Sequence, residues 1–195
     1  MIVLLIAHKA EAQCFFRRMT FRKETCGYLS GDTCLVITGN KDRLSRHILP
    51  GIKKLKQDFK EIHLLNLGFA AVLNRRLPLD TPVQVDLSVN ESGETAIPLT
   101  SAGLNLPAVR CITVADSRRP LDSAKEELPV VVDMELFQLA GETRRLALPL
   151  SSVKIVSDFY EQHVPARVLI EKAAPLSCQL YDIYQSFQEK LNDLV

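Results

Sequence analysis

The sequence opens on Met-Ile-Val-Leu-Leu-Ile-Ala, an unbroken apolar run that constrains the fold more than any other feature. Branched apolar residues at consecutive positions favour a strand buried on both faces, as in the middle of a parallel sheet, over a half-exposed strand. Residues 10–19 follow with alanine, cysteine and phenylalanine among polar residues, a spacing compatible with a helix packed on that sheet. This order predicts an α/β architecture with a central strand at residues 2–7.

The same alternation of strands and helices continues along the chain. Strands are predicted at residues 34–39, 62–67, 129–133 and 152–157, and helices at residues 41–59, 134–146 and 167–194. The first of these helices is expected to break at Pro50-Gly51. Residues 77–114 hold short apolar runs punctuated by proline and glycine, which indicates strands and loops. Residues 129–157 predict a βαβ unit with a right-handed parallel crossover. We expect one domain over residues 1–195, a three-layer α/β/α fold with a central mixed, largely parallel sheet.

Composition excludes several classes of function. Lys plus Arg (24) nearly equals Asp plus Glu (23), so no broad field favours nucleic acid or an anionic membrane. The opening apolar run is too short for a signal peptide core or a membrane span. Five widely spaced cysteines, without a CxxC pair or a histidine at zinc-ligand spacing, predict reduced thiols and no metal site. We therefore expect a cytoplasmic protein with no cofactor that binds neither nucleic acid nor membranes.

Carboxylates follow three of the predicted strands, at Glu11, Glu135 and Asp158. Ligands of open parallel sheets bind beyond the carboxyl ends of the strands, so these positions are candidates for chemistry. Two carboxyl groups across a glycosidic bond can act as general acid and general base, and a third can accept hydrogen bonds from ribose hydroxyls. The same residue types often cap helices instead, and we assign Asp133 to capping.

Four stretches, read in order, resemble one known superfamily. They are IAHKAEAQ, VITGNKDR, LLNLGFAAVLNRRLPLDTPVQVD and VVVDMELFQLAGETRRLALPLSSVKIVSD. Their order and spacing are similar to the purine nucleoside phosphorylase superfamily, and most closely to its hydrolytic branch. That branch contains the 5′-methylthioadenosine/S-adenosylhomocysteine nucleosidases and the futalosine hydrolases. The resemblance implies a nucleoside phosphorylase-like fold and a homodimer in which a neighbouring subunit often completes the 5′ pocket.

The resemblance also implies roles for individual residues. Glu11 matches the glutamate that deprotonates the attacking water, and Asp158 matches the aspartate that protonates purine nitrogen 7, oriented by Ser157. Glu135 matches the glutamate that binds the ribose hydroxyls, with Met134 packed against the sugar or, alternatively, in the core. Base contacts fall to Ser157 and Asp158, together with the backbone of Val114 and Ser117.

Three departures from the family pattern refine the expectation. Phe69-Ala-Ala-Val stands where phosphorylases carry Ser-Ala-Gly-Gly, so water is the expected nucleophile rather than phosphate. The turn at residues 38–42 lacks the usual Gly-x-Gly-Lys element, and we do not place it in the site. The segment at residues 113–120 is short and lacks the aromatic residue that stacks on the base; Phe137 and Phe159 could replace it but are expected in the core.

Together these observations predict a nucleosidase that hydrolyses the N-glycosidic bond of a 5′-substituted adenosine or inosine-type nucleoside. Futalosine or 6-amino-6-deoxyfutalosine, in menaquinone biosynthesis, is the favoured substrate because the altered motifs suit a bulky 5′ group. The alternatives are a 5′-methylthioadenosine/S-adenosylhomocysteine nucleosidase, a phosphorylase and a non-catalytic nucleoside-binding homologue.

Overall fold

Strand β1 (Ile2–Ile6) lies in the interior of the sheet, as its sequence predicts. The computed structural model describes residues 1–25, 27–39, 49–117, 120–122, 126–162, 164 and 166–193. All five residues of β1 are buried, and β1 pairs in parallel with β4 (Thr33–Ile37) on one side and β5 (His63–Val72) on the other. A continuous apolar run is required here because both faces of the strand are covered.

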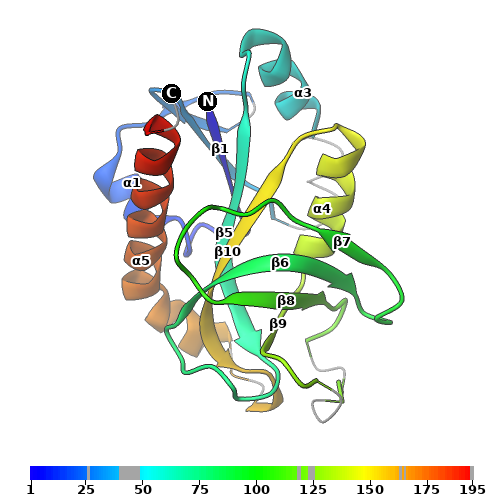
Figure 1. Ribbon diagram of the computed structural model, residues 1–195. Coiled ribbons are helices and arrows are strands. Elements are labelled where there is room, and N and C mark those ends of the chain that lie inside the picture. The colour runs from blue at the N-terminus through cyan, green and yellow to red at the C-terminus, as the bar shows by residue number, and fades with distance from the viewer. Residues whose placement is uncertain are drawn as a thin grey trace.

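Beyond β5 the sheet closes on itself (Figure 1). The ring of strands runs from β5 through β10 (Leu150–Phe159), β6 (Pro82–Asn90), β8 (Ala108–Thr113) and β9 (Val130–Asp133), and returns to β5. The remaining described strands extend the sheet past β4 or flank β6, and are β3 (Tyr28–Ser30), β2 (Arg22–Lys23) and β7 (Ala96–Pro98). Closure brings β9 against the end of β5, at Ala71 and Val72, and brings Asp133 at the end of β9 to Lys154 in the middle of β10.

Helices cover both faces of the sheet, which confirms the predicted three-layer α/β/α fold (Figure 1). Helices α1 (Gln13–Arg18) and α5 (Ala166–Asn192) lie on one face, and α3 (Leu49–Asp58) and α4 (Leu136–Arg145) on the other. Alternate residues of β1 supply the two cores: Leu4 packs with Phe15 of α1, whereas Leu5 belongs to the cluster of Ile52 and Leu136. The period-2 geometry of a strand explains this division.

The helix boundaries differ from the sequence prediction in two places. Helix α1 begins at Gln13 because residues 9–12 form a turn, and that turn carries Glu11. Pro50 and Gly51 lie in the first described turn of α3; the predicted helical residues 41–48 before them are outside the described residues. No helix among the described residues is both long and apolar enough to cross a membrane.

The predicted parallel βαβ unit at residues 129–157 is wrong. Strands β9 and β10 do not pair with each other; both flank β5, with β10 parallel to it and β9 antiparallel. A strand, a helix and a strand in sequence do not reveal which strand separates them in space. Here the closed ring reverses the direction of β9 relative to β5.

The prediction that all cysteines are reduced thiols is also wrong. Cys14 of α1 and Cys178 of α5 form a disulfide with a Cα–Cα distance of 5.1 Å, although 164 residues separate them in sequence. The pairing follows from the packing of α1 on α5, which sequence spacing cannot show. Cys34 and Cys111 are buried and take no part in this bond.

Candidate active site

The carboxylate of Glu11 is fixed by two backbone amides. Glu11 is only 7% exposed; its Oε2 accepts a hydrogen bond from the amide of His8 at 2.9 Å, and its Oε1 accepts one from the amide of Phe69 at 3.0 Å. The first bond closes the turn after β1, and the second ties the turn to β5. Each carboxylate oxygen has lone pairs beyond these bonds, so the group can still accept a proton or a hydrogen bond.

A buried ion pair joins β10 to β9 beside this carboxylate. Lys154 is 4% exposed, and its Nζ lies 2.9 Å from Oδ2 of Asp133. Asp133 also accepts hydrogen bonds from Thr113 Oγ1 at 2.7 Å and from the amide of Leu136 at 3.1 and 3.3 Å. The bonds to Leu136 confirm the predicted capping of α4 by Asp133. They also show that Asp133 has a second role, as the partner of a buried cation.

The charge on Lys154 is stabilised by its neighbours. Burial alone would lower the pKa of the ammonium group, but the negative charges of Asp133 and, to a lesser extent, Glu135 raise that pKa above its ordinary value. Lys154 therefore remains protonated throughout the neutral range. Lys154 is not among the residues predicted from the sequence, although a lysine inside an otherwise uncharged buried strand, Ser-Ser-Val-Lys-Ile-Val, is a usable signal for a paired ion.

Gly68 borders both Glu11 and Lys154. A Cβ atom at position 68 would lie 3.1 Å from Oε1 of Glu11 and 3.6 Å from Nζ of Lys154. Any side chain at this position would therefore press against the carboxylate and fill the region between the two charged groups. A glycine is needed here for close approach rather than for an unusual backbone angle.

Glu135 belongs to the same cluster of charges. Burial raises the pKa of its carboxyl group above the usual range. The positive charge of Lys154 opposes this rise, and His8 opposes it more weakly, whereas the negative charges of Asp133 and Glu11 add to it. Glu135 therefore interacts electrostatically with Lys154, Asp133 and Glu11. The preceding residue, Met134, is 47% exposed, so the expectation that it could be ordinary core is wrong. Its position between β9 and α4 keeps it out of both core layers.

Asp158 lies further along the same two strands, at a bulge in β10. The register with β5 shifts between Val156 and Asp158, which leaves Ser157 as the extra residue, and Asp158 faces Ala71. Ser157 Oγ donates a hydrogen bond to Oδ1 of Asp158 at 2.5 Å. Ala71 is two residues from Phe69, about 7 Å along a strand. The structure thus places Asp158 at the same end of the sheet as Glu11, beyond it along β5.

The residues expected at the base follow β8. Val114 is buried and its amide donates to the carbonyl of Asp133 at 2.9 Å, whereas Ser117 is exposed on the loop that follows. Phe137 and Phe159 are partly buried and pack against the core, as expected, and the guanidinium of Arg75 lies 4.9 Å from the centre of the Phe159 ring. In the turn at residues 38–42, residues 40–42 lie outside the described residues.

Within the described ranges, no three His, Cys, Asp or Glu side chains are grouped so that they could hold a metal ion. The ammonium of Lys154 forms an ion pair with Asp133 and also attracts the carboxylate of Glu135. The arrangement therefore offers a carboxylate that can accept a proton, a fixed cation and further carboxylates that can accept hydrogen bonds.

The mixed strand ring with helices on both faces matches the fold of solved nucleosidase structures, which confirms the predicted nucleoside phosphorylase-like fold. Three solved structures with this fold are nucleosidases. A Chlamydia trachomatis MTAN bound to MTA is 21% identical, with a TM-score of 0.72, and the match covers 95% of this chain and 98% of that chain. An Arabidopsis thaliana 5′-methylthioadenosine nucleosidase in apo form is 16% identical, with a TM-score of 0.76, and the match covers 98% of this chain and 95% of that chain. A Streptococcus pyogenes S-adenosylhomocysteine nucleosidase in complex with 5-methylthiotubericidin is 15% identical, with a TM-score of 0.75, and the match covers 97% of this chain and 96% of that chain.

At these identities the likeness establishes the fold. No protein-family model matches the sequence, and no curated protein matches it either.

The raised pKa of Glu135 predicts that this residue lowers stability at neutral and alkaline pH. An acid whose pKa is raised by folding binds protons more tightly in the folded state, so the free energy of unfolding falls as pH rises from the unfolded pKa through the folded one. Glu135→Gln removes this charge. We expect urea denaturation to show a higher free energy of unfolding for Glu135→Gln than for the wild type at pH 8, and a difference that shrinks towards pH 4.

Glu189→Gln is the matched control, because Glu189 is exposed on α5. It should leave the stability unchanged at both pH values. If the Glu135→Gln protein were no more stable than the wild type at pH 8, the result would contradict a raised pKa of Glu135 in the folded protein.

Proposed function

We propose that this protein is a purine nucleosidase, which hydrolyses the N-glycosidic bond of a 5′-substituted adenosine or inosine-type nucleoside and releases the free base. The observation that carries the proposal is the carboxylate of Glu11, buried and held by two backbone amides beside Gly68 and Lys154. Glu135 and Asp158 supply two further carboxyl groups at the same end of the sheet. The fold that the chain shares with solved nucleosidases supports the same conclusion.

In the proposed reaction the carboxyl groups divide the work. Glu11 accepts a proton from water as its oxygen attacks C1′, and the bond from C1′ to the base nitrogen breaks. Asp158, hydrogen-bonded by Ser157, donates a proton to the departing purine, so the base leaves neutral. Glu135 accepts hydrogen bonds from the ribose hydroxyls, and the negative charges oppose the positive charge that develops on the sugar. Lys154 acts on Glu135 from a distance, because its positive charge opposes the rise in the pKa of that carboxyl group.

Hydrolysis fits the site better than phosphorolysis. The side chain of Phe69 packs with the apolar cluster under α1 and α5, and its amide is already donated to Glu11. An incoming phosphate would meet the carboxylate of Glu11 and repel it, whereas water can donate a hydrogen bond to that carboxylate. Retention of Glu11, Glu135 and Asp158 also argues against a homologue that only binds nucleosides.

For the 5′ substituent we propose the carboxyphenyl-type group of futalosine or 6-amino-6-deoxyfutalosine, and hence a step in menaquinone biosynthesis. Met134 exposes apolar surface next to Glu135, where a 5′ substituent could lie. 5′-Methylthioadenosine is the competing substrate, because similar structures were determined with MTA and with adenine. We include a homodimer in the proposal, since exposed Leu128 and Met134 would be covered by a second subunit.

A side-by-side measurement of base release tests the proposal. The purified protein is incubated with futalosine, 6-amino-6-deoxyfutalosine, 5′-methylthioadenosine, S-adenosylhomocysteine, adenosine and inosine, and the free base is measured by chromatography. We expect release from at least one 5′-substituted nucleoside in phosphate-free buffer. A strict requirement for phosphate would replace hydrolysis with phosphorolysis, and inactivity on every nucleoside would leave no support for an enzyme.

Removing the proposed acid should abolish turnover. Asp158→Asn cannot donate a proton to the purine, so kcat should fall by about 10²- to 10⁴-fold while the fold is retained. The comparison is Asp58→Asn, at the exposed end of α3, which should keep wild-type activity. Circular dichroism confirms that both variants are folded; an active Asp158→Asn protein would refute the role of this residue.

Gly68→Ala tests the close approach at the proposed base. The added methyl group would crowd Oε1 of Glu11 and the Nζ of Lys154, so kcat should fall by about 10²-fold, within the range of a lost general base. Gly141→Ala makes the same chemical change in α4, where the new atom would meet only Ile97 at 3.8 Å, and should leave kcat unchanged. Equal rates for the two variants would show that the region beside Gly68 does not take part.

A further inference from the structure

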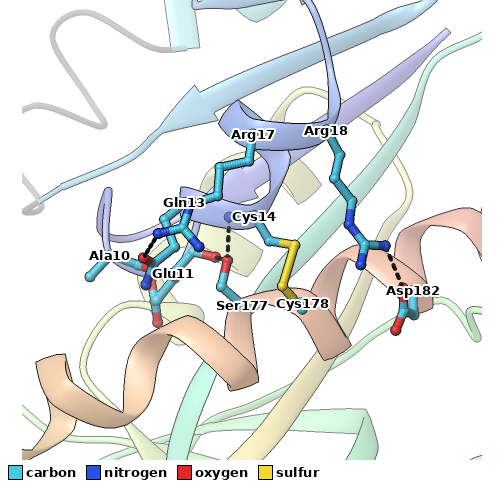
Figure 2. The surroundings of a disulfide bond; sticks show 9 residues. All are labelled: Ala10, Glu11, Gln13, Cys14, Arg17, Arg18, Ser177, Cys178 and Asp182. Carbon is cyan, nitrogen blue, oxygen red and sulfur yellow. Dashed lines mark hydrogen bonds and ion pairs between the residues drawn. A yellow bond between two sulfur atoms is a disulfide. The ribbon is translucent and has the colours of Figure 1, made fainter.

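The disulfide lies directly behind the turn that carries Glu11. Figure 2 shows Cys14, in the first turn of α1, bonded to Cys178 of α5, with Glu11 and Ser177 beside the bond. Helix α1 has only six residues, so its first turn and the turn at residues 9–12 are parts of one short segment. Contacts that fix the position of Cys14 therefore also fix the position of Glu11.

Two consecutive residues of α5 hold this segment in different ways. Ser177 is fully buried; its Oγ accepts a hydrogen bond from the amide of Cys14 at 2.9 Å and donates one to the carbonyl of Glu11 at 2.6 Å (Figure 2). Cys178 adds the covalent bond to Cys14. The hydrogen bonds depend on the distance between α1 and α5, and the disulfide limits that distance.

The bond can be reached from one side. Cys14 is 1% exposed, whereas Cys178 is only partly buried, so a thiolate from solution would attack Sγ of Cys178. Cys34 and Cys111 are completely buried. Burial also raises the pKa of the Cys111 thiol, which keeps that group protonated and unreactive.

We propose that Cys14 and Cys178 form a reversible redox-modification site that controls the position of Glu11. A small dithiol attacks Cys178 and forms a mixed disulfide, and the released Cys14 thiolate takes up a proton. The second thiol of the dithiol then displaces Cys178, which is protonated in turn, and the dithiol becomes a cyclic disulfide. In the reverse direction, a low-molecular-weight disulfide accepts the two electrons and leaves as two thiols.

Reduction should loosen the turn without unfolding the protein. Phe15 contacts the rings of Tyr181 and Tyr184 at centroid distances of 5.3 and 5.8 Å, and this packing continues to hold α1 on α5. The oxidised state is therefore the active one, and the reduced state keeps the fold but holds the Glu11 turn less firmly. The effect on turnover rests on the proposed function; the effect on the turn does not.

The test compares protein oxidised with glutathione disulfide and protein reduced with dithiothreitol. Peptide mapping without reductant should find Cys14 linked to Cys178 in the oxidised sample alone. Backbone amides of residues 8–14 should exchange hydrogen on the order of tenfold faster in the reduced sample, because loss of the cross-link favours local opening. With the active substrate, kcat should fall on the order of tenfold and KM should change less than about twofold, since Glu11 acts on water rather than in binding.

Variants separate this site from other cysteines. Cys178→Ser should exchange like the reduced protein under both conditions, whereas Cys34→Ala should keep the wild-type response. Absence of the Cys14–Cys178 link, or equal amide exchange in the two samples, overturns the proposal. If neither sample releases base from any nucleoside, the proposed function has failed, and the peptide map and the exchange rates still decide the redox site.

Discussion

The buried ion pair between Lys154 and Asp133 is the interaction on which the acidic end of the molecule depends. Removing one partner of such a pair typically costs about 3–5 kcal/mol, because the other charge is left in the interior without compensation. Here the ammonium does more than satisfy Asp133, since Glu135 and Glu11 lie in the same electrostatic environment. The cation allows several carboxylates to remain close together, which a site of this kind requires.

Unequal strand lengths bring that cation to the right place. Strand β1 has five residues, whereas β5 and β10 have ten each, so the two longer strands continue past the end of β1 and into the closed ring. Lys154 is paired in register with Gly68 on β5, directly beyond the level where β1 ends opposite Leu67. Glu11, in the turn that follows β1, therefore meets the middle of the longer strands rather than their ends.

The sequence predicted the elements and candidate carboxylates better than their connections. Apolar periodicity located the strands at β1, β4, β5, β9 and β10, because a buried strand needs apolar residues wherever it lies in the sheet. It could not indicate that β9 runs antiparallel to β5, since local patterns do not encode neighbours. Glu11 was found from its position after a strand, but the amide of Phe69 that fixes it was not, because backbone groups carry no sequence signal.

By itself, the sequence determined the α/β layering, the capping of α4 by Asp133 and the set of carboxyl groups that the proposed chemistry uses. These depend on residue type and on short-range spacing, which the chain specifies locally. Only the tertiary structure decided that Lys154 is the counter-charge of Asp133, that Gly68 allows the close approach and that Cys14 and Cys178 are bonded. Each of these depends on distances between segments up to 164 residues apart, and such distances are set by the packing of strands and helices as a whole.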